Sequence, residues 1–253
     1  MSVLLLNDTS SYHCGCKEVV KYIVKAFNCT HTVITGGVVS NIDWHSYKLV
    51  VLNGEGTLHH NRPNAIKFLT ALRAAQAAGC RTVIVNSVWQ DMSHDFDDVL
   101  QKCESVTVRD VFSQQDIAKH GVFAAVHPDF SIMNHVPREH YEPVRVYEGQ
   151  YFFGGNDIGG YSRLNIFKQS WSELVNRLRS SELLITGRHH EMYAACVARC
   201  KFVTVPGNTW KNEGLLASAG AIIPFDIDGV LEGKYNSEYD KLWRYLDGFQ
   251  LTP

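Results

Sequence analysis

Short apolar runs alternate with longer amphipathic stretches along the first half of the chain. The runs are rich in Val, Ile and Leu and end at turn-forming residues, which predicts strands buried on both faces. They are Val3–Leu6, His31–Thr35, Leu49–Leu52, Thr82–Asn86, Ser105–Val108 and Val122–Val126. Between them, Lys17–Phe27, Asn64–Ala78 and Asp110–Lys119 place apolar residues at helical spacing. This alternation predicts a mainly parallel sheet with helices on both faces.

The pattern pauses between Met133 and Tyr151, where prolines and a cluster of charges indicate a linker or crossover. It then resumes and predicts a second α/β unit. The expected strands are Tyr151–Phe153, Leu183–Thr186, Phe202–Val205 and Ala221–Pro224, and the expected helices are Arg163–Arg179, Glu191–Arg199, Asn212–Ala219 and Ser237–Leu246. We therefore expect two Rossmann-like domains that face a cleft, residues 1–140 and 141–253.

Composition narrows the class of protein. The 253 residues include 24 Lys and Arg and 26 Asp and Glu, and the formal charge of −2 excludes an overall cationic coat for nucleic acid. The first apolar run, Val3–Leu6, is too short for a signal-peptide core, and the uncharged run Leu215–Phe225 falls far below the roughly 20 residues that cross a bilayer. Because 7 cysteines without such a signal indicate free thiols, we expect a soluble cytoplasmic protein with no membrane span.

Candidate chemistry lies in the loops that follow the strands, because open α/β sheets bind ligands beyond the carboxyl ends of their strands. After Leu52, two glycines flank Glu55, which lets the backbone turn tightly and expose its amides. In a partly desolvated position Glu55 would have a raised pKa and could act as a general acid or base. A simple turn in which Glu55 caps a helix or faces water is an equally open interpretation.

Two later loops carry positive charge at the start of a helix. Arg188 stands beside His189 and His190, and backbone amides with a guanidinium suit a phosphate or carboxylate. The alternative is an Arg188–Glu191 ion pair with a buried histidine. In the next loop Lys211 could neutralise a phosphate, while the alternative there is simple capping of the helix.

Two further loops contain candidate polar groups. Asp129 follows His127 and could be a nucleophile or base. The alternative is that the His-Pro step only leads the chain away from the strand, a common structural feature with no catalytic role. Arg109 and Asp110 follow another strand, and a salt-bridged helix start is the favoured interpretation there. We expect no metal, because the Cys14–Cys16 spacing is too tight for the usual zinc motif and adjacent histidines such as His189 and His190 diverge.

In these segments the chain resembles the polysaccharide pyruvyl transferase family, which includes sugar-transferring relatives. The matching segments are Asn7–Thr9 with His13–Cys16, Asn53–Thr57, Val108–Asp110 with Ser113, Thr186–His190, and Asn208–Leu216. The resemblance implies a compact fold of the glycosyltransferase B type, with Arg188 and His190 as the motif's anion-binding pair for an activated donor. Because Gly54-Glu55-Gly56 stands where the family often has three glycines, the chain is similar to the glycosyl-transferring members.

The expected function is glycosyl transfer from a nucleotide-activated sugar to a hydroxyl acceptor, with a glycan as the family's acceptor. Residues 1–140 would hold the acceptor and residues 141–253 the donor. The candidate catalytic residues are Glu55, Asp129 and His190, and the candidate binding residues are Asn7, His13, Gly54, Gly56, Thr57, Arg109, His127, Arg188, His189, Asn208, Lys211 and Glu213. Glu213 would bind ribose hydroxyls.

Two alternatives stay open beside glycosyl transfer. One is pyruvyl transfer from phosphoenolpyruvate onto a polysaccharide sugar, and the other is a non-catalytic module that binds a sugar or nucleotide. We expect no tightly bound cofactor, since the nucleotide sugar or phosphoenolpyruvate is a co-substrate. A modified nucleic acid is a conceivable acceptor, but the charge balance does not support it.

Overall fold

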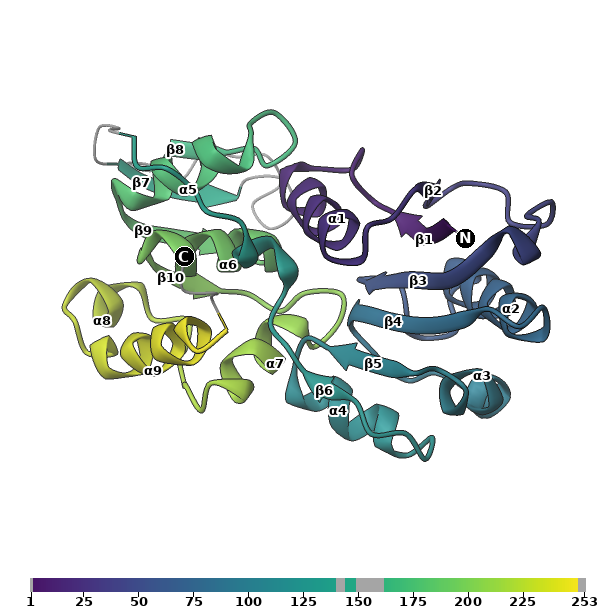
Figure 1. Cartoon of the computed structure of the whole chain (residues 1–253). Helices are drawn as coiled ribbons and strands as arrows, with labels where there is room; N and C mark the ends of the chain where they lie inside the picture. The colour runs from purple at the N-terminus through teal and green to yellow at the C-terminus, as the bar shows by residue number, and fades with distance from the viewer. Residues whose placement is uncertain (1, 140–143, 149–161, 250–253) are drawn as a thin grey trace. The chain divides into compact units, whose positions relative to one another are not determined.

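The computed structural model describes residues 2–139, 144–148 and 162–249, and these form two compact units (Figure 1). One unit comprises Met1–Ser11 and Val19–Phe130, and the other comprises Tyr12–Glu18 and Ser131–Pro253. Each unit contains a parallel sheet connected by helices, so the predicted α/β class with two Rossmann-like units is confirmed. The domain boundary at residue 140 stays a prediction.

The first unit is a six-stranded parallel sheet in the order β2-β1-β3-β4-β5-β6. Its strands are β1 (Ser2–Asp8), β2 (His31–Ile34), β3 (Tyr47–Glu55), β4 (Arg81–Ser87), β5 (Ser105–Val108) and β6 (Ala125–Val126), which confirms every strand predicted for this half. The strand order reverses between β1 and β3. In doubly wound sheets such a reversal opens a crevice at the carboxyl ends of the two strands, where ligands bind.

The helices of the first half follow local signals. They are α1 (Cys14–Phe27), α2 (Pro63–Ala77), α3 (Asp97–Gln101) and α4 (Val111–Ala118), with 3-10 turns η1 (Trp44–Ser46), η2 (His94–Phe96) and η3 (Phe130–Met133). Pro63 begins α2, where its fixed φ suits the first turn, and Gly79 follows its end with φ +86°. The short α3 was not predicted, because five residues are too few for a helical period to show.

The second unit is a four-stranded parallel sheet in the order β10-β9-β7-β8. Its strands are β7 (Val144–Glu148), β8 (Ser162–Leu164), β9 (Ser181–Thr186) and β10 (Lys201–Thr204). The predicted linker at 133–151 is wrong in part, because β7 pairs with both β8 and β9 there. The charged residues of this segment interrupt the apolar positions of the strand, so the sequence pattern did not indicate it. The strand predicted at Tyr151–Phe153 lies outside the described residues.

The helices of the second unit correct two further predictions. They are α5 (Trp171–Arg179), α6 (His189–Ala198), α7 (Lys211–Ser218), α8 (Ile227–Leu231) and α9 (Asn236–Asp247). The helix predicted from Arg163 begins only at Trp171, because Ser170 and Glu173 form a capping box. Residues 221–224 form no strand and lead instead toward α8. No helix within the described ranges is long and apolar enough to cross a bilayer.

The core of the second unit surrounds α6. Every residue of this helix except Val197 is buried, and the helix contacts α5, α7 and α9 as well as β9 and β10. A helix that is buried on nearly every side lies inside a layered domain rather than on its surface, even though the first turn of α6 is polar. The first turn of α6, which carries the candidate histidines, is therefore held rigidly.

Candidate functional site

Three polar residues at the carboxyl ends of adjacent strands adopt left-handed backbone conformations. They are Asn7 on β1 (φ 65°), Glu55 on β3 (φ 25°) and Asn86 on β4 (φ 55°). All three are buried, with exposed fractions of 0%, 4% and 1%. A glutamate with positive φ is uncommon and costs about 1–3 kcal/mol, so such strain persists where the surrounding contacts impose it and clusters at functional sites.

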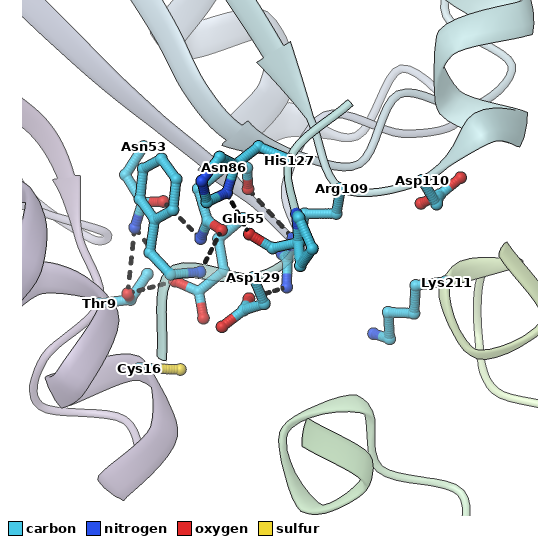
Figure 2. Close-up of polar contacts among 12 residues, drawn as sticks. Thr9, Cys16, Asn53, Glu55, Asn86, Arg109, Asp110, His127, Asp129 and Lys211 are labelled. Atoms are coloured by element: carbon cyan, nitrogen blue, oxygen red, sulfur yellow. Dashed lines mark hydrogen bonds and ion pairs between the residues drawn. The ribbon is translucent and has the colours of Figure 1, made fainter. Parts of the chain in front are cut away.

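The carboxylate of Glu55 is held on one oxygen by two donors (Figure 2). The Thr9 hydroxyl donates to Oε2, and Asn53 Nδ2 donates to the same oxygen at 3.1 Å. Asn7 Nδ2 in turn donates to the Asn53 carbonyl at 2.6 Å and to the Thr57 hydroxyl at 3.0 Å. These bonds fix the position of the carboxylate at the reversal between β1 and β3.

Arg109 and Asp129 form a buried ion pair that continues the same network. Arg109 Nη1 donates to Asp129 Oδ2 at 2.5 Å, and the two side chains are 1% and 0% exposed. Arg109 Nε also donates to the Asn86 carbonyl at 3.1 Å, and Asn86 Nδ2 reaches Asn53 Oδ1 at 3.4 Å. Figure 2 shows this chain of contacts, which links Glu55 to Asp129 through two asparagines.

The interpretation of Arg109 and Asp110 as one salt-bridged helix start is wrong for Arg109, because its guanidinium pairs with Asp129. Asp110 does cap α4, accepting from the Ser113 backbone N–H at 2.8 Å. Burial raises the pKa of Asp110 to about 6 despite these hydrogen bonds. In Figure 2 its side chain lies apart from the network around Glu55.

His127 is half-buried beside Asp129, and its ring packs on Phe130 with centroids 4.9 Å apart. Its Nδ1 lies 2.7 Å from the Pro128 carbonyl, an acceptor, so Nδ1 carries the proton and Nε2 is the acceptor of the neutral ring. Burial lowers the pKa of His127 below its ordinary value, which favours that neutral form.

The glycines on either side of Glu55 differ in their role. A Cβ added to Gly54 would lie 2.5 Å from the Ser87 side chain, so β3 and β4 approach each other too closely for any other residue. Gly56 is exposed, and Thr57 is half-buried where it accepts from Asn7. Gly54 therefore serves close packing of the strands at the site.

In the second unit, the loop after β9 organises the start of α6. The Thr186 hydroxyl accepts from the Arg188 backbone N–H at 2.9 Å and donates to Glu191 at 2.6 Å. Arg188 is the N-cap residue and is half-buried, with its guanidinium 4.9 Å from the centroid of the Phe167 ring. Thr186 and Glu191 thus fix the turn, and Phe167 orients the cation.

The loop after β10 is tied to the loop after β9. Asn212 is fully buried and donates from Nδ2 to the Gly187 carbonyl at 3.0 Å. Lys211, the first residue of α7, donates to the exposed Asn208 at 3.0 Å, and Glu213 is also exposed. The cations of positions 188 and 211 therefore lie on adjoining loops at the carboxyl ends of neighbouring parallel strands.

The two adjacent histidines of α6 have different neighbours. His190 packs against His13, with ring centroids 4.8 Å apart, whereas His189 packs against Tyr193 at 4.7 Å. Cys16 Sγ lies 3.4 Å from His13 Nε2. The expected divergence of the pair holds only in part, because the two rings also contact each other edge to face with centroids 5.9 Å apart. The sequence did not reveal that one member joins His13 and Cys16. The spacing of those two residues, one helical turn apart, was the available signal.

Comparison with known proteins identifies the fold. No family model matches the chain, and no curated protein matches it either. A UDP-GlcNAc 2-epimerase from Neisseria meningitidis bound to UDP-GlcNAc is 7% identical, with 99% of this chain and 96% of that chain covered and a TM-score of 0.58. A putative UDP-N-acetylglucosamine 2-epimerase from Listeria monocytogenes is 9% identical, with 98% and 92% covered and a TM-score of 0.54.

A functionally uncharacterised protein from Klebsiella pneumoniae is similar to the same degree, at 12% identity, 84% and 86% coverage and a TM-score of 0.55. At these identities the similarity concerns architecture. The chain has the Rossmann-like α/β fold of the glycosyltransferase B type. The resemblance to polysaccharide pyruvyl transferases stays a prediction.

Proposed function

We propose that the protein is a glycosyltransferase that uses a nucleotide-activated sugar. The second unit would bind the donor's diphosphate through Arg188 and Lys211, and Glu55 in the first unit would accept the proton of the acceptor hydroxyl. The observation that carries this assignment is the pair of cation-bearing helix starts on loops joined by Asn212.

The start of a helix attracts anions, because its first backbone N–H groups lack partners within the helix and its dipole is positive there. Here two such starts adjoin, one with a guanidinium and one with an ammonium. A diphosphate carries enough negative charge to use both. The N. meningitidis structure with UDP-GlcNAc bound supports a nucleotide sugar as the ligand for this fold.

Glu55 suits the role of general base better than Asp129 does. Its carboxylate is anchored by Thr9 and Asn53 on Oε2, so its orientation is set before substrate binds. Asp129 is fully buried against Arg109, which holds it as the charged partner of a guanidinium. We assign Asp129 and Arg109 the positioning of Asn86 and the strand ends around Glu55.

Nucleotide binding tests the donor site. Calorimetric titration with UDP, UDP-GlcNAc and a panel of other nucleotides and nucleotide sugars should show saturable binding. Arg188→Ala and Lys211→Ala should each weaken it roughly 10- to 100-fold, because each loses a charge-assisted contact of about 1.5–3 kcal/mol. Arg244→Ala is the matched control, since Arg244 is exposed on α9 of the same unit. Absence of saturable binding to every member of the panel would rule out the nucleotide sugar.

Turnover tests the role of Glu55. Glu55→Gln keeps the shape of the side chain and should leave the nucleotide Kd within about twofold while abolishing sugar transfer to a panel of hydroxyl acceptors. Full transfer by this variant would contradict the assignment. Phosphate release from phosphoenolpyruvate with an acceptor sugar, and no use of nucleotide sugars, would instead establish the pyruvyl reaction.

A further inference from the structure

His13, Cys16 and His190 gather three metal-binding atoms at one point of the second unit. Each residue offers one ligand atom, and the three atoms lie within 4.8 Å of one another. We propose that these residues form a zinc site. Metal binding at this site requires no nucleotide, so the zinc proposal can be tested independently of the glycosyltransferase assignment.

The distances suit tetrahedral coordination. Zinc binds sulfur at about 2.3 Å and imidazole nitrogen at about 2.0–2.1 Å, which places the two ligand atoms about 3.6 Å apart in a tetrahedron. Cys16 Sγ and His13 Nε2 are 3.4 Å apart. The His13 and His190 rings are in edge-to-face contact, with centroids 4.8 Å apart and an interplanar angle of 73°. Small rotations of side chains would therefore complete the site.

The backbone on both sides of the cluster is held by contacts that do not involve its ligands. The first turn of α1 is anchored where the Cys14 N–H meets the Ile166 carbonyl at 3.5 Å and Asn134 Nδ2 donates to the Glu18 carbonyl at 3.0 Å. A Cβ on Gly15 would lie 2.6 Å from the His190 ring, so only glycine allows that ring to approach α1. His190 itself belongs to the rigid first turn of α6.

The donor set selects the metal. One thiolate and two imidazoles favour zinc over magnesium or calcium, which prefer oxygen ligands. Three protein ligands leave a fourth position for water or a substrate atom, as in catalytic zinc sites. His13 is half-buried whereas Cys16 and His190 are buried, so that position would be reached from the His13 side.

Metal binding has a definite proton balance. The Cys16 thiol gives up its proton to solvent on forming the Zn–S bond, and the two histidines bind as neutral imidazoles. Coordination through Nε2 places the proton of His13 on Nδ1. The long 3.4 Å contact from the Cys16 N–H to that Nδ1 would then be given up. At neutral pH we expect about one proton released per zinc bound.

Another group of possible ligands lies in the first unit and provides an internal comparison. His94 and His120 place their Nδ1 atoms 2.8 Å and 2.6 Å from the two oxygens of Asp97. These hydrogen bonds already use the carboxylate on both sides. The group contains no sulfur, so its metal complexes lack the absorption of a thiolate ligand. A cobalt spectrum therefore distinguishes the two groups.

The test is metal binding to the full chain after treatment with a chelator. Titration with Co²⁺ should produce a thiolate-to-metal charge-transfer band and the intense visible bands of tetrahedral cobalt, both displaced by one equivalent of Zn²⁺. Competition with a chromophoric chelator should then show Zn²⁺ affinity at least 100-fold lower in Cys16→Ser and His190→Gln. Circular dichroism checks that each variant is folded.

The matched controls are the neighbours of two ligands, Cys14→Ser and His189→Gln, which should change zinc affinity by less than about threefold. Absence of the charge-transfer band in the unmodified chain would overturn the zinc site. So would equal loss in Cys14→Ser and Cys16→Ser, or zinc binding that survives Cys16→Ser and disappears in His94→Gln. In each of these results nucleotide binding to Arg188 and Lys211 would still be testable on its own.

Discussion

The two parallel sheets have related strand orders, but the residues at their carboxyl ends differ in kind. In the first unit, strained residues and a buried ion pair form a closed hydrogen-bonded network around one carboxylate, Glu55. In the second unit, two adjoining helix starts each present a cation, Arg188 and Lys211. Under the proposed function, the first network would position Glu55 as the proton acceptor, and the second arrangement would bind the donor's diphosphate.

The buried pair in the first unit should produce the largest effect on stability. Asp129→Ala leaves the Arg109 guanidinium buried without its counter-charge, and we expect a loss of about 3–5 kcal/mol in the free energy of unfolding. Denaturant titration measures it. Asp247→Ala breaks the exposed pair with Arg199, whose side chains are 45% and 48% exposed, and should cost less than about 1 kcal/mol. Equal losses would mean that burial does not make the Asp129 pair more important for stability than an exposed pair.

The charge on Asp110 should make stability fall as pH rises. A carboxyl whose pKa is about 6 in the folded chain and 3.8 when unfolded favours folding below pH 4, and this contribution is lost as pH rises through 6. Asp110→Asn keeps a capping side chain without the charge. It should match the unmodified chain near pH 4 and exceed it by about 3 kcal/mol at pH 7.5. If the difference in free energy of unfolding between the two proteins stayed constant from pH 4 to pH 7.5, the raised pKa of Asp110 would be contradicted.

Close packing of β3 against β4 should be sensitive to a single methyl group. Gly54→Ala pushes a Cβ against Ser87 and should cost about 1–3 kcal/mol and disturb Glu55, lowering turnover as well as stability. Gly36→Ala is the control, because a Cβ at Gly36 meets no atom within 4 Å. If thermal unfolding shifts equally in both variants, packing at Gly54 is not the cause.

The tie between the two cationic loops should have the smallest effect on stability and a visible effect on binding. Asn212→Ala removes the donor to the Gly187 carbonyl, and we expect a loss of about 1–2 kcal/mol together with weaker nucleotide binding. Asn208→Ala, at an exposed position in the loop that precedes α7, should change stability by less than about 0.5 kcal/mol. If Asn212→Ala left nucleotide affinity unchanged, the contact between the two loops would not be needed for nucleotide binding.

The local hydrophobic pattern predicted the helices and strands better than it predicted which side chains contact one another. Every strand of the first sheet was predicted, because buried parallel strands are continuous apolar runs that alternate with helical periods. Strand β7 was missed where charged residues interrupt its apolar positions, and α3 was missed because it is short. These errors concern elements whose pattern is weak within a few residues of sequence.

The amino-acid sequence by itself determined the α/β class, the strands of the first sheet and the loops that hold the polar residues. Which polar groups meet was decided by the tertiary structure: Arg109 pairs with Asp129 rather than with its neighbour Asp110, and His190 joins His13. The physical reason is range. Helix and strand periods are set by residues two to four positions apart, whereas partners at a sheet's edge are chosen by strand order and by helix packing between distant segments.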